Sequence, residues 1–281
     1  MKRIVLSALT IALCGILTAQ ITTPQPSTKS KMEQTVGLTD ISVSYSRPSV
    51  KGRKIFGNLV PFDKIWRTGA NMNTVVTFAD DVTIGENTLK AGDYALYTKP
   101  GKTDWEIYFY SDTKNWGTPR NWDDKKVAAK LSVKSSSTSM PVELFTILIN
   151  SKNNTSGEIL LSWENTMVSI PVQVPTDKKA MASINKALNI GAGDYFSSAV
   201  YYLNADKDIE QAKNWIDKAC EMTKEQPRYW YLRQQALITA KAGNKKQAIK
   251  IAEKSLELAK EAGDNSYVLS NTTSIKEWSK K

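Results

Sequence analysis

The chain has 281 residues, of which 38 are basic, 28 are acidic and 41% are hydrophobic, and its formal net charge is +10. This balance is typical of a globular protein and excludes a disordered chain, a disulfide scaffold and a polytopic membrane protein. The sequence has no histidine, which excludes the usual serine and cysteine triads, His-ligated zinc and imidazole acid-base catalysis. We therefore expect no metal and no cofactor.

Residues 1–19 are predicted to form a secretory signal peptide. Lys2 and Arg3 precede an apolar run of 14 residues, and Ala19 supplies a small residue before a polar start. The run is shorter than the roughly 20 residues that span a bilayer, which favours cleavage over a retained anchor. We expect an exported protein that is periplasmic, outer-membrane-associated or secreted, with no transmembrane segment after cleavage.

The two cysteines bear on processing and on redox state. Cys14 leaves lipoprotein processing open, but Leu13 before it is larger than that cleavage prefers. Cleavage after Ala19 removes two basic residues, lowers the net charge from +10 to +8, and leaves Cys220 as the only cysteine. No intramolecular disulfide can then form. We expect Cys220 to be a small, partly buried side chain with no nucleophilic role.

The first half of the chain has the pattern of half-buried strands. Hydrophobic and polar residues alternate between turn residues, which predicts eight or nine short strands. They are 41–45, 75–78, 82–84, 94–97, 105–110, 127–133, 142–149, 159–163 and 167–174. Glu164-Asn165 is predicted to be a hairpin turn. No helical crossover is present, so we predict an antiparallel β-sandwich-like domain over residues 30–175.

After Pro175 the hydrophobic residues follow helical spacing. Helices are predicted to begin at Asp208 and Asn244, each preceded by another helix, around 196–203 and 229–242. Ala212 and Ala248, at equivalent places, lie 36 residues apart.

Paired helices with this spacing resemble tetratricopeptide repeats, whose period is about 34 residues. We predict an all-α, helical-hairpin domain over residues 178–281, with residues 264–281 as a capping helix. The whole chain is then an α+β protein in two segregated domains. An ordinary helical bundle covering the β domain is the alternative for the second half.

One segment is unlike ordinary strand or helix sequence. It contains the series Ser-Arg-Pro at 46–48, Lys-Gly-Arg at 51–53, Ile-Phe-Gly at 55–57, Val-Pro at 60–61 and Trp-Arg-Thr-Gly-Ala-Asn at 66–71. This series resembles the domain of unknown function family 2911, which is found in exported proteins of Bacteroidota. The resemblance continues through Leu89-Lys90-Ala91-Gly92-Asp93-Tyr94, Trp116-Gly117 and Leu161-Ser162-Trp163-Glu164-Asn165, and covers about residues 30–175.

The resemblance implies a β-rich exported domain and brings no established activity. Family copies commonly carry an acidic residue directly after the Ala-Asn pair, whereas Met72 follows Asn71 in this chain. We therefore expect no carboxylate chemistry at that position.

The same segment concentrates positive charge. From Arg47 to Arg67 there are six basic residues and one acidic residue, whereas residues 20–175 hold 18 basic and 15 acidic residues. The arginine fork suits bidentate binding of carboxylate or phosphate. The predicted ligand-binding residues are Arg47, Lys51, Arg53, Arg67, Asn71 and Trp116. The alternative is a structural plug, in which the arginines bind backbone carbonyls while Phe56, Val60 and Trp66 fill the core.

Tryptophans are the second candidate feature of the β half. Trp105 and Trp163 lie in alternating strands and are predicted to be core residues. Trp116 and Trp122 flank a polar loop and are predicted to be exposed, where they could stack on sugar rings.

These features predict an exported, non-enzymatic binding protein. Its β domain would hold an anionic or carbohydrate-like ligand, and its helical domain would bind a protein partner. The competing hypothesis is a histidine-independent hydrolase of a cell-envelope polymer that uses Asp or Glu, because glycoside hydrolysis needs only two carboxylates. Nucleic acid is not an expected partner, because the lysines of the helical half alternate with acids along solvated faces.

Overall fold

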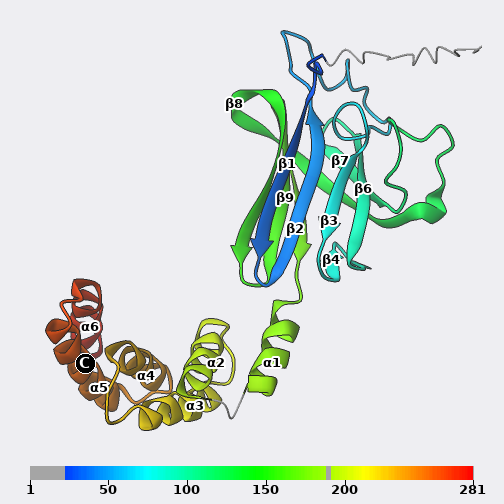
Figure 1. The fold of residues 1–281 in the computed structure, drawn as a ribbon. Coiled ribbons are helices and arrows are strands. Elements are labelled where there is room, and N and C mark those ends of the chain that lie inside the picture. The colour runs from blue at the N-terminus through cyan, green and yellow to red at the C-terminus, as the bar shows by residue number, and fades with distance from the viewer. Residues whose placement is uncertain (1–22, 188–190, 281) are drawn as a thin grey trace, which may run out of the picture.

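The computed structural model describes residues 23–187 and 191–280, and the predicted signal peptide lies outside them. The described chain contains an antiparallel β domain followed by a region of six helices (Figure 1). This confirms the prediction of two segregated α+β domains.

The β domain contains nine strands within the described residues. They are β1 (Thr28–Val36), β2 (Thr39–Arg47), β3 (Thr74–Phe78), β4 (Val82–Ile84), β5 (Asn87–Leu89), β6 (Gly92–Pro100), β7 (Asp104–Tyr110), β8 (Val127–Asn153) and β9 (Ser156–Gln173). A short 3-10 helix, Asp124–Lys126, precedes β8. The strand order is β1-β2-β3-β6-β7-β8-β9-β4-β5, and every neighbouring pair is antiparallel.

The long strand β8 connects the two parts of the sheet. Its first part, up to Lys134, pairs with β7, and its second part, from Ser135 onward, pairs with β9. The two parts enclose one hydrophobic core, which draws Val43 from β2, Ile107 from β7, Ile147 from β8 and Leu161 from β9. These side chains are at most 2% exposed, as alternation along each strand requires.

Three details of the strand prediction were wrong. The segments 127–133 and 142–149 belong to the single strand β8, because the polar residues between them continue the pairing through register shifts. Glu164 is not a hairpin turn: it has φ +53° within β9, and the β8–β9 hairpin turns between Asn153 and Ser156. Strands β1 and β5 were missed, because Val36 alone of β1 and Leu89 alone of β5 is fully buried.

The six helices of the described chain are α1 (Thr176–Ala187), α2 (Ala192–Asn204), α3 (Ile209–Met222), α4 (Tyr229–Lys241), α5 (Lys245–Glu261) and α6 (Asn265–Trp278). The side chains of Asp208, Asn244 and Asp264 accept hydrogen bonds from the first-turn N–H groups of α3, α5 and α6, which stabilises these helix starts. No helix in the described ranges is long and apolar enough to cross a membrane.

Small buried residues allow these helices to pack closely. Ala212 and Ala219 of α3 and Ala248 and Ala252 of α5 are fully buried. Cys220 of α3 is partly buried, and burial raises the pKa of its thiol to about 12. The thiol is therefore protonated at neutral pH, as expected for an inert cysteine.

Candidate functional site

The family-defining segment is the connection between β2 and β3, residues 48–73, and it closes one end of the β domain. Ile55, Phe56 and Val60 are buried in the core. The ring of Phe56 contacts Trp105 at a centroid distance of 4.8 Å, and Trp66 lies nearly parallel to Trp163 at 5.8 Å. This aromatic cluster fixes the irregular segment in the core, as the structural-plug alternative predicted for these apolar residues.

Backbone hydrogen bonds hold the same segment against the strands. The N–H of Phe145 in β8 donates to the carbonyl of Pro48, and the N–H of Val50 donates to Glu143. Trp66 and Thr98 of β6 exchange both backbone hydrogen bonds, at 2.7 and 3.0 Å. The loop is therefore a rigid support for the side chains that project from it.

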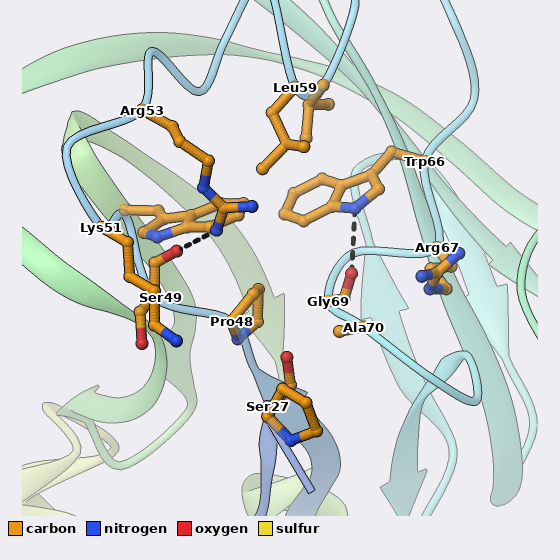
Figure 2. Close-up of a pocket in the computed structure, with 13 residues that line it drawn as sticks. Ser27, Pro48, Ser49, Lys51, Arg53, Leu59, Trp66, Arg67, Gly69 and Ala70 are labelled. Carbon is orange, nitrogen blue, oxygen red and sulfur yellow. Dashed lines mark hydrogen bonds between the residues drawn. The ribbon is translucent and has the colours of Figure 1, made fainter.

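A cavity of about 380 Å³ opens beside this plug. Figure 2 shows Lys51 and Arg53 at one side of it and Trp66, Gly69 and Ala70 at the other, with Leu59 between them. Its lining residues are Pro26, Ser27, Pro48, Ser49, Lys51, Arg53, Leu59, Val60, Trp66, Arg67, Gly69, Ala70 and Trp163. The cavity is thus walled by apolar side chains and carries three basic residues.

Two of these basic residues come from the turn after β2. The guanidinium of Arg53 donates to the carbonyls of Val50, at 3.0 Å, and Ser49, at 2.5 Å. Lys51 adopts φ +49°, and its backbone N–H, not its ammonium, binds the Glu143 carboxylate. Both side chains are exposed, and neither forms an ion pair within the described chain, so their charges are available to a ligand.

Arg67 lies beyond Gly69 and Ala70, on the side away from Arg53 (Figure 2). Its Nε is buried without a hydrogen-bond partner among the described residues, and so is the indole nitrogen of Trp163, another lining residue. A buried donor without an acceptor costs about 1–3 kcal/mol. Both nitrogens belong to residues that line the cavity, but the two atoms are themselves buried.

Three of the predicted ligand residues, Arg47, Asn71 and Trp116, do not line the cavity. Arg47 donates from Nε to the carbonyl of Phe145 at 2.9 Å and from Nη2 to Thr146 at 2.7 Å, so it ties β2 to β8. Asn71 has φ +59° and donates to the Ser27 carbonyl and the Ser46 hydroxyl. The cavity lies beside Asn71, but the Asn71 amide supports the loop.

Of the four tryptophans considered as candidates, two are buried, one is exposed and one is partly buried. Trp105 and Trp163 are 2% exposed, which confirms their placement in the core. Trp116 is 74% exposed but does not line the cavity. Trp122 was predicted to be exposed, and this was wrong, because its ring packs against Tyr97, Tyr108 and Tyr110.

No carboxylate belongs to the lining of this cavity, among the residues that the structure describes. Two carboxylates bind the backbone of the loop: Glu143 accepts from the N–H of Lys51, and Glu164 accepts from the N–H of Ile55 at 3.4 Å. Within the described ranges no group of three Cys, Asp or Glu side chains is placed to hold a metal ion. The arrangement suits binding of an anion better than acid-base chemistry.

The lining residues Pro26, Ser27, Pro48 and Leu59 were not predicted. Pro48 belongs to the Ser-Arg-Pro motif, but no sequence pattern indicates that these four residues are neighbours, and their proximity arises only when β1, β2 and the connection meet at one end of the domain. The indole of Trp66 was predicted as a plug; it also donates to the Gly69 carbonyl at 3.1 Å and forms a wall of the cavity.

Comparison with known families agrees with the motif. Residues 27–172 match the family described as Protein of unknown function (DUF2911). The chain belongs to this family. The match begins just before β1, ends one residue before the end of β9, and thus covers nearly all of the β domain of this DUF2911 protein. No curated protein and no solved structure matched the sequence.

Proposed function

We propose that this DUF2911 protein is an exported, non-enzymatic binding protein whose β domain holds an anionic ligand in the cavity beside Trp66. The proposal rests on the positive charge of the residues that line the cavity. Lys51, Arg53 and Arg67 line the cavity, and the described lining has no carboxylate to neutralise them. Charge-assisted hydrogen bonds from such groups to carboxylate, sulfate or phosphate are among the strongest in proteins.

The apolar walls narrow the ligand class. Trp66, Leu59 and Pro48 offer flat or aliphatic surfaces next to the cations. A sugar acid combines an apolar ring face with oxygen acceptors and a negative charge, and it fits these features together.

The helical region supports a second part of the proposal. The pairs α2–α3 and α4–α5 follow one another with an approximate period of 36 residues, and α6 packs against α5. We propose that these are two tetratricopeptide-like pairs with a capping helix, and that they bind a protein partner. Exposed Trp230, over which the Arg228 guanidinium lies at 5.9 Å, is a suitable contact residue.

The proposal is tested by calorimetric titration of residues 20–281 with galacturonate, sugar phosphates and the matching neutral sugars. We expect anionic sugars to bind and neutral ones not to. Lys51→Gln and Arg67→Gln should each weaken binding about tenfold, which corresponds to about 1.4 kcal/mol.

Lys102→Gln and Arg120→Gln are the matched controls, because both residues are exposed and neither lines the cavity. Equal losses in the two sets of variants would reduce the effect to net charge and reject the cavity as the site. Binding that neither Lys51→Gln nor Arg67→Gln changes would reject it as well.

A further inference from the structure

A second cavity, of about 390 Å³, lies next to the first on the outer face of β1, β2 and β3. It is lined by Lys29, Ser30, Lys31, Ser44, Tyr45, Ser46, Met72, Asn73, Val75 and Thr113. No residue is shared with the first cavity, and none of these residues was predicted to bind a ligand.

The same three chain segments build both cavities. In each segment, two residues that are two positions apart line different cavities. Ser27, Pro48 and Ala70 line the first cavity, and their counterparts Lys29, Ser46 and Met72 line the second. The three pairs lie at the start of β1, at the end of β2 and in the connection to β3. In the extended segments at β1 and β2, residues two apart are separated by about 7 Å. The cavities therefore adjoin along these two segments, and in the connection Ala70 and Met72 flank Asn71, whose φ is +59°.

Asn71 lies between the two cavities. Its amide donates to the carbonyl of Ser27, which lines the first, at 3.2 Å and to the hydroxyl of Ser46, which lines the second, at 3.3 Å. The side chain of Asn71 therefore forms the boundary between the two cavities. An elongated ligand could pass over it and occupy both cavities.

The lining of the second cavity repeats the chemistry of the first. Lys29 has no hydrogen bond or ion pair with another described residue, while Lys31 is paired with Glu33 at 2.7 Å at the surface. Ser44 and Thr113 present hydroxyl groups, and Met72, which is 39% exposed, adds an apolar patch. The described lining again has no carboxylate.

We infer that the two cavities are subsites for neighbouring, disaccharide-sized parts of one acidic oligosaccharide. This inference rests on the proposed function of the first cavity and extends it from a single sugar acid to a chain. Hydroxyl, amide and ammonium groups match the hydroxyl and carboxylate groups of a uronate chain, and Trp66 and Met72 offer one apolar contact in each cavity. Asn71 sets the step between the subsites.

The experiment compares an α-1,4-linked galacturonate disaccharide with the hexasaccharide in titrations of residues 20–281. We expect the hexasaccharide to bind about tenfold or more tightly than the disaccharide, which corresponds to about 1.4 kcal/mol or more. The double variant Lys29→Gln/Lys31→Gln should lose this gain and bind the disaccharide as before. Lys51→Gln should weaken binding of both.

The control is Lys102→Gln/Lys134→Gln, which removes the same charge from exposed positions outside both cavities. Equal affinities for the two lengths, or equal effects of the two double variants, would overturn the second subsite while leaving the first intact. A disaccharide insensitive to Lys51→Gln would instead overturn the proposed function, and the inference with it. A hexaglutamate peptide that binds as tightly as the hexasaccharide would overturn the assignment to carbohydrate.

Discussion

At the scale of single residues, Gly69 shows how closely the loop is fitted to the strands. It adopts φ +151°, and a β-carbon at this position would lie 3.0 Å from the carbonyl oxygen of Ser46 and 3.1 Å from the hydroxyl oxygen of Thr74. Its own carbonyl accepts the Trp66 indole N–H. Glycine is needed here both for the backbone conformation and for the space.

Gly69→Ala should destabilise the β domain by about 2 kcal/mol or more, because strain in the backbone adds to a steric clash. Gly52→Ala is the matched control: Gly52 also has positive φ, +69°, but a β-carbon there would meet nothing within 4 Å. We expect a melting temperature lower by about 4 °C or more for Gly69→Ala, and a clearly smaller change for Gly52→Ala. Similar losses in calorimetry would show that the close approach to Ser46 and Thr74 is unimportant.

The residue scale also shows what could be predicted of the site. The charge balance of residues 47–67 pointed to the segment that lines the first cavity, because clustered like charges can be read directly from sequence. It could not separate Arg53, at the cavity, from Arg47, which binds the Phe145 carbonyl. That difference depends on the position of β8, about 100 residues later in the chain.

At the scale of secondary-structure elements, three strands are linked across the outer face of the sheet through Glu106 of β7. Its carboxylate binds Lys130 of β8 at 2.6 Å and Lys99 of β6 at 2.9 Å, and it accepts from the Tyr108 hydroxyl at 2.9 Å. Hydrogen bonds from Lys130, then Lys99, lower the pKa of Glu106 to about 2. The charged form of Glu106 is therefore stabilised in the folded state.

Glu106→Gln should reduce the free energy of unfolding at pH 7 by about 1 kcal/mol, because partial exposure of the two lysines screens the interaction. The folded-state pKa lies below the unfolded value of about 4.5. The contribution is therefore present above pH 4.5 and is lost as the pH falls toward 2. Urea unfolding of wild type and variant should converge at about pH 2.

Glu86→Gln provides the comparison, since Glu86 is exposed in the β4–β5 turn and has no hydrogen bond or ion pair with another described residue. It should leave stability unchanged across the same pH range. A constant difference between wild type and Glu106→Gln from pH 7 to pH 2 would contradict the ion-pair explanation.

Helices and strands with a strong hydrophobic periodicity could be predicted from the sequence. Strands that are held in place by pairing with distant segments could not. Helix starts at Asp208, Asn244 and Asp264 carry their own caps, so local sequence determines them. Strand β1 has only Met32 and Val36 as apolar residues, and β8 is kept continuous through its serine-rich middle by pairing with β9. Such pairing energy comes from a distant segment and leaves no local pattern.

At the scale of the whole molecule, α1 connects the β domain to the other helices. Lys179 of α1 binds the Asp80 carboxylate and the Leu38 carbonyl, each at 2.6 Å, and Thr176 accepts from the Leu38 N–H. On the side of the helical region, Asp177 accepts hydrogen bonds from Tyr201 and Lys207. A few polar contacts therefore couple the two domains.

Lys179→Gln should loosen α1 from the β domain without unfolding either part. The ion pair is partly exposed, so we expect a loss of at most about 1 kcal/mol, seen as faster amide hydrogen exchange in α1 with unchanged exchange in β6 and β7. Lys178→Gln, at the exposed neighbouring position, should exchange like wild type.

The hydrogen bond from Lys179, followed by that from Thr39, holds the pKa of Asp80 below its ordinary value of 3.8. The coupling should therefore be complete above about pH 4 and decrease as the pH falls below it. If α1 exchanges at the same rate in both variants, Lys179 does not couple the domains, and packing around Leu38 must do so instead.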